Sequence, residues 1–338
     1  MNKLTKIGAS ALCGSLAVIS TANAGELTVT GGVAMTWTSL SGQVTGNPLG
    51  MASNLTFAGS GELDNGWNVA LSIAQGDAGA YSNTNIVIGV AGVGDIRVDQ
   101  GVSGTGIQRM DDLTPSVWEE ADGAGLSAGI AKVTGVSAAA NIEFTPSSDY
   151  VPAGLTLVAA WSPDADSGST VGDKAASGDN GGALQSGWDF TATATDELHG
   201  VSGLTLYGGI SRVDQRQTAG TIVGDSEEQV YGVKYALGGF TAGYQRNDDD
   251  TGVSGAGSSY ENTMYSVTFS VNDNLSVGYN HVESDKTGGN TAEASSYQIA
   301  YTMGGATISI ADVDVTNQSY ASSGRNLEAT IVKLGLAF

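Results

Sequence analysis

Cysteine is almost absent from the 338-residue chain, and the single one, Cys13, lies in a segment that we expect to be removed. Lys3 and Lys6 precede an apolar stretch, Ile7–Ile19, and the small residues Ala22-Asn23-Ala24 follow it. This order is typical of a secretory signal peptide that is cut after a small residue. We therefore predict a signal peptide over residues 1–24 and an exported chain over residues 25–338 that contains no disulfide.

Basic residues are also scarce. Lysine and arginine number 13 against 35 acidic residues, so the net charge is −22, and loss of the two signal lysines lowers it to −24. A nucleic-acid-binding protein needs a basic face, so no nucleic-acid partner is expected. The two histidines, His199 and His281, belong to no recognisable Ser/His/Asp or zinc pattern, and the sequence predicts neither catalysis nor a cofactor.

Long apolar runs are missing beyond the signal segment, so the sequence predicts no membrane-spanning helix. Short alternating segments take their place. Leu27, Val29, Val33, Met35 and Trp37 alternate with threonine, glycine and alanine, which is the two-residue period of a strand. Each such segment has an apolar face and a face of small or hydroxyl residues. This arrangement favours a strand between lipid and a water-filled lumen over a strand in a soluble sandwich.

About sixteen such segments follow one another, and short turns alternate with long loops. The expected strands cover residues 27–37, 54–58, 67–74, 85–91, 95–100, 139–145, 155–161, 188–196, 204–212, 230–237, 240–246, 265–271, 275–283, 297–303, 306–313 and 327–338. An even number of this size is typical of outer-membrane barrels with an aqueous channel. The predicted fold class is all-β, a transmembrane antiparallel β-barrel.

One stretch, Gly101–Ala138, breaks the alternation after the fifth expected strand. A long irregular segment in a compact domain is usually functional or disordered. We predict that it folds inward as a constriction loop whose carboxylates face Arg97 across the pore and attract cations. The five acids are Asp111, Asp112, Glu119, Glu120 and Asp122. The alternative is a solvated charge cluster on an external loop. Trp118 and Pro115 either attach the segment to the wall or are ordinary loop residues.

Three stretches carry a family resemblance: the signal ending Ala22-Asn23-Ala24, the run Asn85–Val90 with Gly94–Val98, and the terminal Leu334–Phe338. With them, the chain resembles a general diffusion porin of Gram-negative bacteria. The resemblance implies a sixteen-stranded barrel, a constriction by the loop after the fifth strand, and a homotrimer. It also implies that the terminal Phe338 is a signal for the outer-membrane assembly machinery.

The chain departs from this family in its few bases. Such porins often place several arginines or lysines opposite an acidic loop. Here the bases at positions expected to face the lumen are Arg97, Lys234 and Lys333, and Arg109 and Lys132 lie in or near the loop.

The acidic loops leave calcium binding open, because Ca²⁺ takes carboxylate oxygens. The candidate set is Asp248, Asp249 and Asp250, although its spacing differs from that of a dedicated calcium loop. Simple surface charge is the alternative.

We therefore predict an outer-membrane porin for passive diffusion of small hydrophilic solutes and ions, with a preference for cations. Its expected partners are outer-membrane lipid, the assembly machinery, its solutes and further copies of itself. A substrate-specific channel is the main alternative. Less favoured are an outer-membrane barrel enzyme, for which no nucleophile and base can be assembled, and a soluble calcium-stabilised β adhesion protein, which the apolar alternation opposes.

Overall fold

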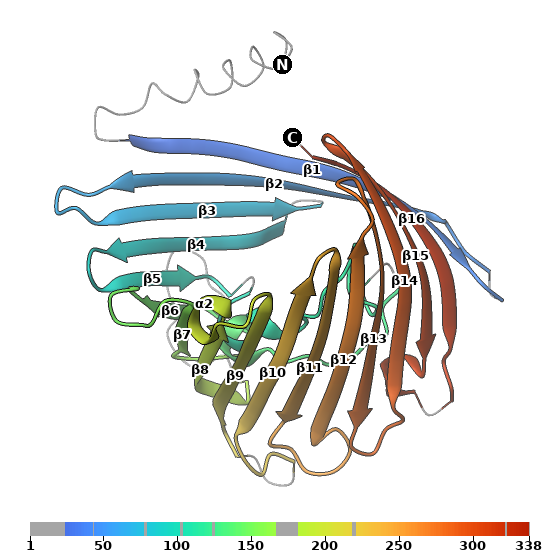
Figure 1. Cartoon of the computed structure of the whole chain (residues 1–338). Coiled ribbons are helices and arrows are strands. Elements are labelled where there is room, and N and C mark those ends of the chain that lie inside the picture. The colour runs from blue at the N-terminus through green and yellow to red at the C-terminus, as the bar shows by residue number, and fades with distance from the viewer. Residues whose placement is uncertain are drawn as a thin grey trace.

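The computed structural model describes residues 24–42, 44–77, 80–101, 104–123, 126–166, 182–217, 221–321 and 323–337. Within them, sixteen antiparallel strands form one closed barrel: each strand pairs with the next, and β1 pairs with β16 (Figure 1). Closure leaves no free strand edge. The predicted fold class and strand number are confirmed. The expected signal peptide lies, apart from Ala24, outside the described residues, as does Phe338.

The strands are long, as a tilted barrel wall requires. They are β1 Ala24–Leu40, β2 Leu49–Glu62, β3 Asn68–Gly76, β4 Ala80–Val90, β5 Gly94–Asp99, β6 Asn141–Pro146, β7 Leu155–Ser162, β8 Leu184–Ala194, β9 Leu204–Gln215, β10 Ser226–Leu237, β11 Phe240–Asp250, β12 Ser259–Ser270, β13 Leu275–Lys286, β14 Ala292–Met303, β15 Ala306–Thr316 and β16 Leu327–Ala337. Short helical turns are η1 Gly106–Met110, η2 Gly135–Ala138, α2 Asp196–His199 and η4 Gln318–Tyr320. None of the described helices is long and apolar enough to span a membrane.

Several strands extend beyond their predicted ends at the side of the long loops. The stretch after Arg246, expected as a loop, continues β11 to Asp250, and its last residues pair with the start of β10. The residues there are polar, so they show no alternation of apolar and polar side chains. Hydrogen bonds to the neighbouring strand nevertheless satisfy their backbone groups. At the opposite side, the strand predicted to reach residue 196 ends at Ala194, and α2 follows, closed by Gly200 at φ 77°.

The two faces of the wall differ in the expected way. Large apolar side chains are exposed on the outer face, among them Trp37 at 53 %, Met51 at 78 % and Met303 at 68 %. The strand register places small and polar residues on the inner face, for example Thr36 opposite Lys333. Residues at alternate positions therefore face either the surroundings of the barrel or its interior.

Candidate pore constriction

The segment between β5 and β6 lies along the interior of the barrel. Figure 1 shows its blue-green trace on the concave side of the strands from β8 onward. Its described residues contain only the short turns η1 and η2, and shortly after the end of β5 the backbone turns at Gly101, where φ is 75°. Because little regular structure satisfies its backbone groups, they need partners on the wall.

Three carboxylates on the inner wall hold the two ends of the segment. Asp189 of β8 accepts from the backbone N–H of Ile107 at 2.9 Å and from that of Val136 at 3.2 Å. Glu143 of β6 accepts from Gly106 N–H at 2.9 Å. Glu228 of β10 accepts from the N–H groups of Thr134 and Gly135, the latter at 2.7 Å. These acceptors satisfy backbone N–H groups that no regular structure pairs, so the three side chains fix η1 and η2 against the wall.

Amide side chains hold the middle of the segment. Buried Gln245 of β11 donates to the carbonyls of Met110 and Asp111, both at 2.8 Å, and accepts from Leu113 N–H at 2.9 Å. Its Oε1 also accepts from Tyr207 Oη at 2.7 Å. One amide thus satisfies both donors and acceptors of an irregular stretch, which an ionised carboxylate cannot do because it only accepts.

The far turn of the segment is held by β13 and β14. Gln298 accepts from Trp118 N–H at 2.9 Å and donates to Glu119 O at 2.6 Å, and Asn280 donates to the same carbonyl at 3.0 Å. Glycines at the inner positions of β11 and β13 make room: a Cβ at Gly278 would stand 2.7 Å from Val117 Cγ2. The wall is therefore shaped to the segment as well as bonded to it.

The loop between β15 and β16 supports the segment on its return. Tyr320 accepts from Ala131 N–H at 2.8 Å, and Ser319 N–H donates to Ala128 O at 2.8 Å. Asn317, Ser319 and Tyr320 adopt positive φ values of 51°, 56° and 59°, a conformation that is unusual for residues other than glycine. Strained backbone of this kind persists where surrounding contacts determine it.

Apolar contacts complete the attachment. Ile107 and Met110 bury with Val133, Tyr207 and Val230. A second cluster joins the segment to β12–β16 through the following residues: Ala121, Ala128, Met264, Val282, Ala311, Val313 and Ile331, with Trp118 packed against it. The hydrophobic core of this barrel thus lies between one side of its wall and the segment.

The structure brings four of the predicted charged residues together. Lys132 donates to Asp112 at 2.6 Å and lies 3.3 Å from Asp122. The pKa of Asp111 beside them is raised to about 7, first by burial and then by Asp112. The pKa of Lys132 is raised, because attraction to Asp122 and Asp112 outweighs its burial. Lys132, and not Arg97, is the cation that contacts these loop acids.

Glu119 and Glu120 lie farther along the turn. Burial, followed by a hydrogen bond with Glu119, raises the pKa of Glu120 to about 9. Glu120 is therefore protonated at neutral pH. The negative charge that five carboxylates would give the segment is reduced by this proton and by Lys132.

The other predicted bases take different partners. Arg97 donates to Asp99 of its own strand at 2.6 Å, and Arg109 pairs with Glu143. Lys234 lies over the ring of Tyr207, with Nζ 5.7 Å from its centroid, and Lys333 lies 5.2 Å from the centroid of the Trp118 indole. All three wall bases, Arg97, Lys234 and Lys333, occupy inner positions in the strand register.

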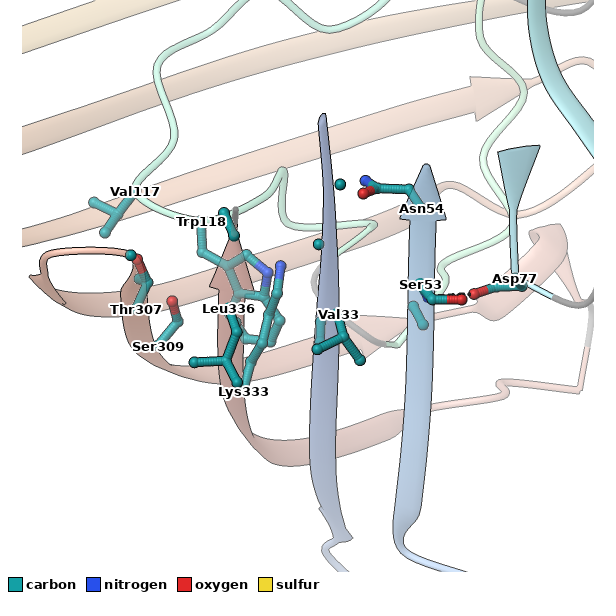
Figure 2. A pocket seen from close by; sticks show the side chains of 17 residues that line it. Val33, Ser53, Asn54, Asp77, Val117, Trp118, Thr307, Ser309, Lys333 and Leu336 are labelled. Atoms are coloured by element: carbon teal, nitrogen blue, oxygen red, sulfur yellow. Dashed lines mark hydrogen bonds between the residues drawn. The ribbon is translucent and has the colours of Figure 1, made fainter. Parts of the chain in front are cut away.

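The wall formed by β1 and β2 is different. Its inner positions, from Thr28 to Thr38 and from Gly50 to Ser60, carry threonine, glycine, alanine, asparagine and serine and no charge. A cavity of about 570 Å³ lies between this wall and the turn that carries Trp118 (Figure 2). The open space beside the segment is therefore bordered by small neutral residues of β1 and β2 together with Asp77 on one side, and by Trp118 and Lys333 on the other.

The predicted calcium residues do not converge. Asp248, Asp249 and Asp250 are successive residues of β11, so the side chain of Asp249 points to the opposite face from the other two. Asp248 pairs with Arg246 at 3.0 Å. In the part of the chain that the structure describes, no three His, Cys, Asp or Glu residues are placed to hold a metal ion.

Sequence reasoning missed the residues that hold the segment: Glu143, Asp189, Glu228, Gln245, Asn280 and Gln298. Their signal was present, because all six occupy inner positions of strands whose other inner residues are mostly small. Large polar side chains at such positions need a partner inside the barrel.

Comparisons with known proteins agree with this architecture. A family model of Gram-negative porins matches residues 8–318. OmpF of Salmonella typhi, in a complex with daunomycin, superposes with a TM-score of 0.67 at 11% identity, over 93% of this chain and 98% of that one. A porin structure refined at 1.8 Å gives 0.65 at 14% identity, and a mutant porin of Rh. blastica gives 0.59 at 15%, each over 93% of this chain and 100% of the other. No curated protein sequence matches the chain.

The sequence identities to these solved structures are low, so the comparison with them shows a common fold and nothing more. The family match covers most of the chain and is independent of them. The chain therefore belongs to the family of Gram-negative porins, β-barrel diffusion channels of the outer membrane.

Proposed function

We propose that the chain forms a passive, water-filled channel that lets small hydrophilic solutes and ions cross the outer membrane. The observation that carries the proposal is a closed sixteen-stranded barrel whose interior is narrowed from one side only. The segment is hydrogen-bonded to β6, β8, β10, β11, β13 and β14, while a cavity separates it from the middle of the inner faces of β1 and β2. A barrel of this size leaves an aqueous channel.

The apolar outer face supports contact with outer-membrane lipid. Met35, Trp37, Leu49 and Met51 of β1 and β2 expose between 50 and 78 % of their surface, and lipid or a neighbouring copy would cover them. A homotrimer, export with cleavage after Ala24, and recognition of Phe338 by the assembly machinery are further parts of the proposal, and they rest on the family resemblance.

The proposed channel prefers cations to anions. Acidic residues outnumber basic ones among the inner wall and segment residues, and Asp95 and Asp112 are examples that are not fully buried. We expect the preference to be weak, because Lys132 offsets two segment acids and Glu120 holds a proton. Carboxylates select cations only where they carry charge toward the pore.

The test is the conductance of the detergent-purified, folded protein in a planar bilayer under a salt gradient. We expect stepwise open channels and a small reversal potential of the sign for cations. A bilayer that stays silent with folded protein contradicts the channel itself. Open channels with a reversal potential near zero or of opposite sign contradict only the cation preference.

A substrate-specific channel is the second candidate, and one observation favours it. Trp118 and Lys333 meet at the edge of the open cavity, where one solute could contact both side chains. Saturable block of the current by one class of solute would separate such a channel from a general one.

A further inference from the structure

The contact between Trp118 and Lys333 stands apart from the other charged contacts of the interior. Figure 2 shows both side chains at the same cavity, Trp118 from the segment and Lys333 from β16. The ammonium nitrogen lies 5.2 Å from the centroid of the indole. A cation over an aromatic face is attracted to the ring electrostatically, but the ring carries no negative charge that would neutralise the cation.

Lys333 differs from the other bases around the segment in its contacts with carboxylates. Arg97 and Arg109 each contact a carboxylate, and Lys132 contacts two. Among the described residues, no carboxylate oxygen lies within 4 Å of the Lys333 ammonium. An ammonium has three N–H donors. The indole ring is at most a weak acceptor for one of them, so Lys333 has donors with which to bind an incoming anion.

The aromatic partner is held in place before any solute arrives. The backbone around Trp118 is fixed by Gln298 and Asn280, with N···O distances between 2.6 and 3.0 Å. Trp118 also packs against the apolar cluster of β12–β16. A ligand therefore need not order the indole, and pre-organisation of this kind favours binding.

The surroundings of the pair add hydrogen-bonding groups and space. Thr307 and Ser309 of β15 line the same cavity, and Ser309 stands directly opposite Lys333 in the register of β15 and β16. Asn54 lies across the cavity on β2, beside Ala34 and Ala52, whose methyl groups leave the space open. Asp77 lines that far side as well, where its carboxylate accepts from Ser53 N–H at 2.8 Å. Hydroxyl and amide donors beside an ammonium match the acceptors of an oxyanion.

We propose that Trp118 and Lys333 form a binding subsite for small organic oxyanions with a flat apolar body, such as aromatic carboxylates and phosphate esters. The oxyanion contacts Lys333 with the β15 hydroxyls, and the apolar body lies against the indole edge or face that borders the cavity. The subsite deepens the proposed channel function and rests on it only in that the solute arrives through the lumen. It makes passage of this class saturable while other solutes diffuse freely.

The experiment measures block of the channel current by benzoate and by phenyl phosphate. Acetate is the anion without a ring, and benzylammonium is a cation of similar shape to benzoate. We expect benzoate and phenyl phosphate to reduce the current saturably, and acetate and benzylammonium to have at least about tenfold weaker effects. If acetate acts as strongly as benzoate, the aromatic part of the proposal is wrong.

Variants assign the block to the pair. Lys333→Met keeps the length of the side chain and removes the charge, and Lys333→Gln is a second variant in case the first folds poorly. Lys234→Met is the matched control, because Lys234 is also an inner lysine placed over an aromatic ring. We expect the benzoate dissociation constant to rise about tenfold in the Lys333 variants and to stay unchanged in K234M. If K234M and K333M raise the benzoate dissociation constant equally, the positive charge of the lumen as a whole attracts benzoate, and there is no subsite at Lys333.

A second measurement separates this proposal from the channel function. Benzoate should change the tryptophan fluorescence of the folded protein in detergent, and Trp118→Phe and Lys333→Met should each abolish that change. If the fluorescence responds but bilayers stay silent, the subsite stands and the channel proposal fails. If channels open normally and neither current nor fluorescence responds to benzoate, the subsite is wrong and the channel stands.

Discussion

The inner faces of β8–β14 and of β1–β2 belong to one barrel, yet they are built for different tasks. The first carries Asp189, Glu228, Gln245 and Gln298, and each of these side chains bonds the backbone of the segment. The second carries only small or neutral polar residues from Thr28 to Thr38 and from Gly50 to Ser60, and a cavity separates this part from the segment. Holding a loop requires large polar side chains at fixed positions, and passage requires their absence. The barrel therefore holds the segment along one part of its wall and leaves open space along another.

The largest expected effect comes from filling the free wall. Ala52 of β2 lines the cavity beside the segment, so Ala52→Trp places a bulky ring in that open space. We expect the single-channel conductance to fall at least about twofold, because the cross-section of the passage is reduced. Planar-bilayer recording of single channels measures it.

The matched control is Met51→Trp, one residue earlier on the outer face, where 78 % of the side chain is exposed. It adds the same ring without entering the lumen and should leave the conductance unchanged. If A52W folds and conducts like the unchanged protein, the passage does not run along β2, and the comparison of the two walls loses its functional meaning.

The next effect comes from releasing the segment from its own wall. Asp189→Ala removes the acceptor of Ile107 N–H and Val136 N–H, and each charged hydrogen bond contributes about 1.5–3 kcal/mol. We expect a lower free energy of unfolding and a noisy conductance, since one end of the segment is no longer fixed. Denaturant unfolding and open-channel noise are the two measurements.

Asp95→Asn provides the control for D189A, because Asp95 is an exposed inner acid of β5 outside the set that holds the segment. Both variants remove one inner negative charge. Equal noise in the two channels would mean that charge, and not attachment of the segment, explains the effect of D189A.

A smaller effect concerns the charges that the segment presents. Lys132→Met removes the cation between Asp112 and Asp122, so both carboxylates would act on the pore without compensation. We expect the reversal potential under a salt gradient to shift toward stronger cation preference. The shift should be small, because water and salt screen the two partly exposed carboxylates. Lys234→Met removes an inner lysine that touches no carboxylate among the described residues. If K132M and K234M shift the potential equally, only the net charge matters.

The sequence could predict the barrel because its signal is local. Alternation within each segment fixes which residues face inward, and it placed Arg97, Lys234 and Lys333 on the inner face before the strand pairing was known. Strand ends were less predictable. Residues 247–250 show no apolar alternation, and they join β11 because the first residues of β10 and β12 pair with them.

The chemistry of the segment could not be predicted in the same way, since burial and partners depend on the whole ring. The sequence shows five carboxylates but not that Lys132, 20 residues beyond Asp112, lies between two of them. It shows Glu143 and Asp189 on inner positions but not that a loop backbone reaches them. That the acids face Arg97 across the pore stays a prediction, and the structure adds a contact of Arg97 with Asp99 of its own strand.

The smallest expected effect at neutral pH is that of Glu120→Gln, and its value lies in its pH dependence. Burial raises the pKa of Glu120 to about 9, so the folded protein carries a neutral carboxylic acid there at neutral pH. Glutamine has the same shape and no charge, and the reversal potential of E120Q should equal that of the unchanged protein. Above a pH of about 9 only the unchanged channel gains a negative charge, and its cation preference should then exceed that of E120Q.

Stability follows the same titration. Between its ordinary value of 4.5 and about 9, Glu120 binds a proton in the folded state that the unfolded chain releases, so the barrel loses stability as pH rises through this window. E120Q should lack this part of the loss. Asp122→Asn is the control, because Asp122 pairs with Lys132 and its removal should alter the reversal potential already at neutral pH. If E120Q and D122N shift the reversal potential equally at neutral pH, Glu120 is ionised there. The expectation that burial keeps Glu120 neutral would then be wrong.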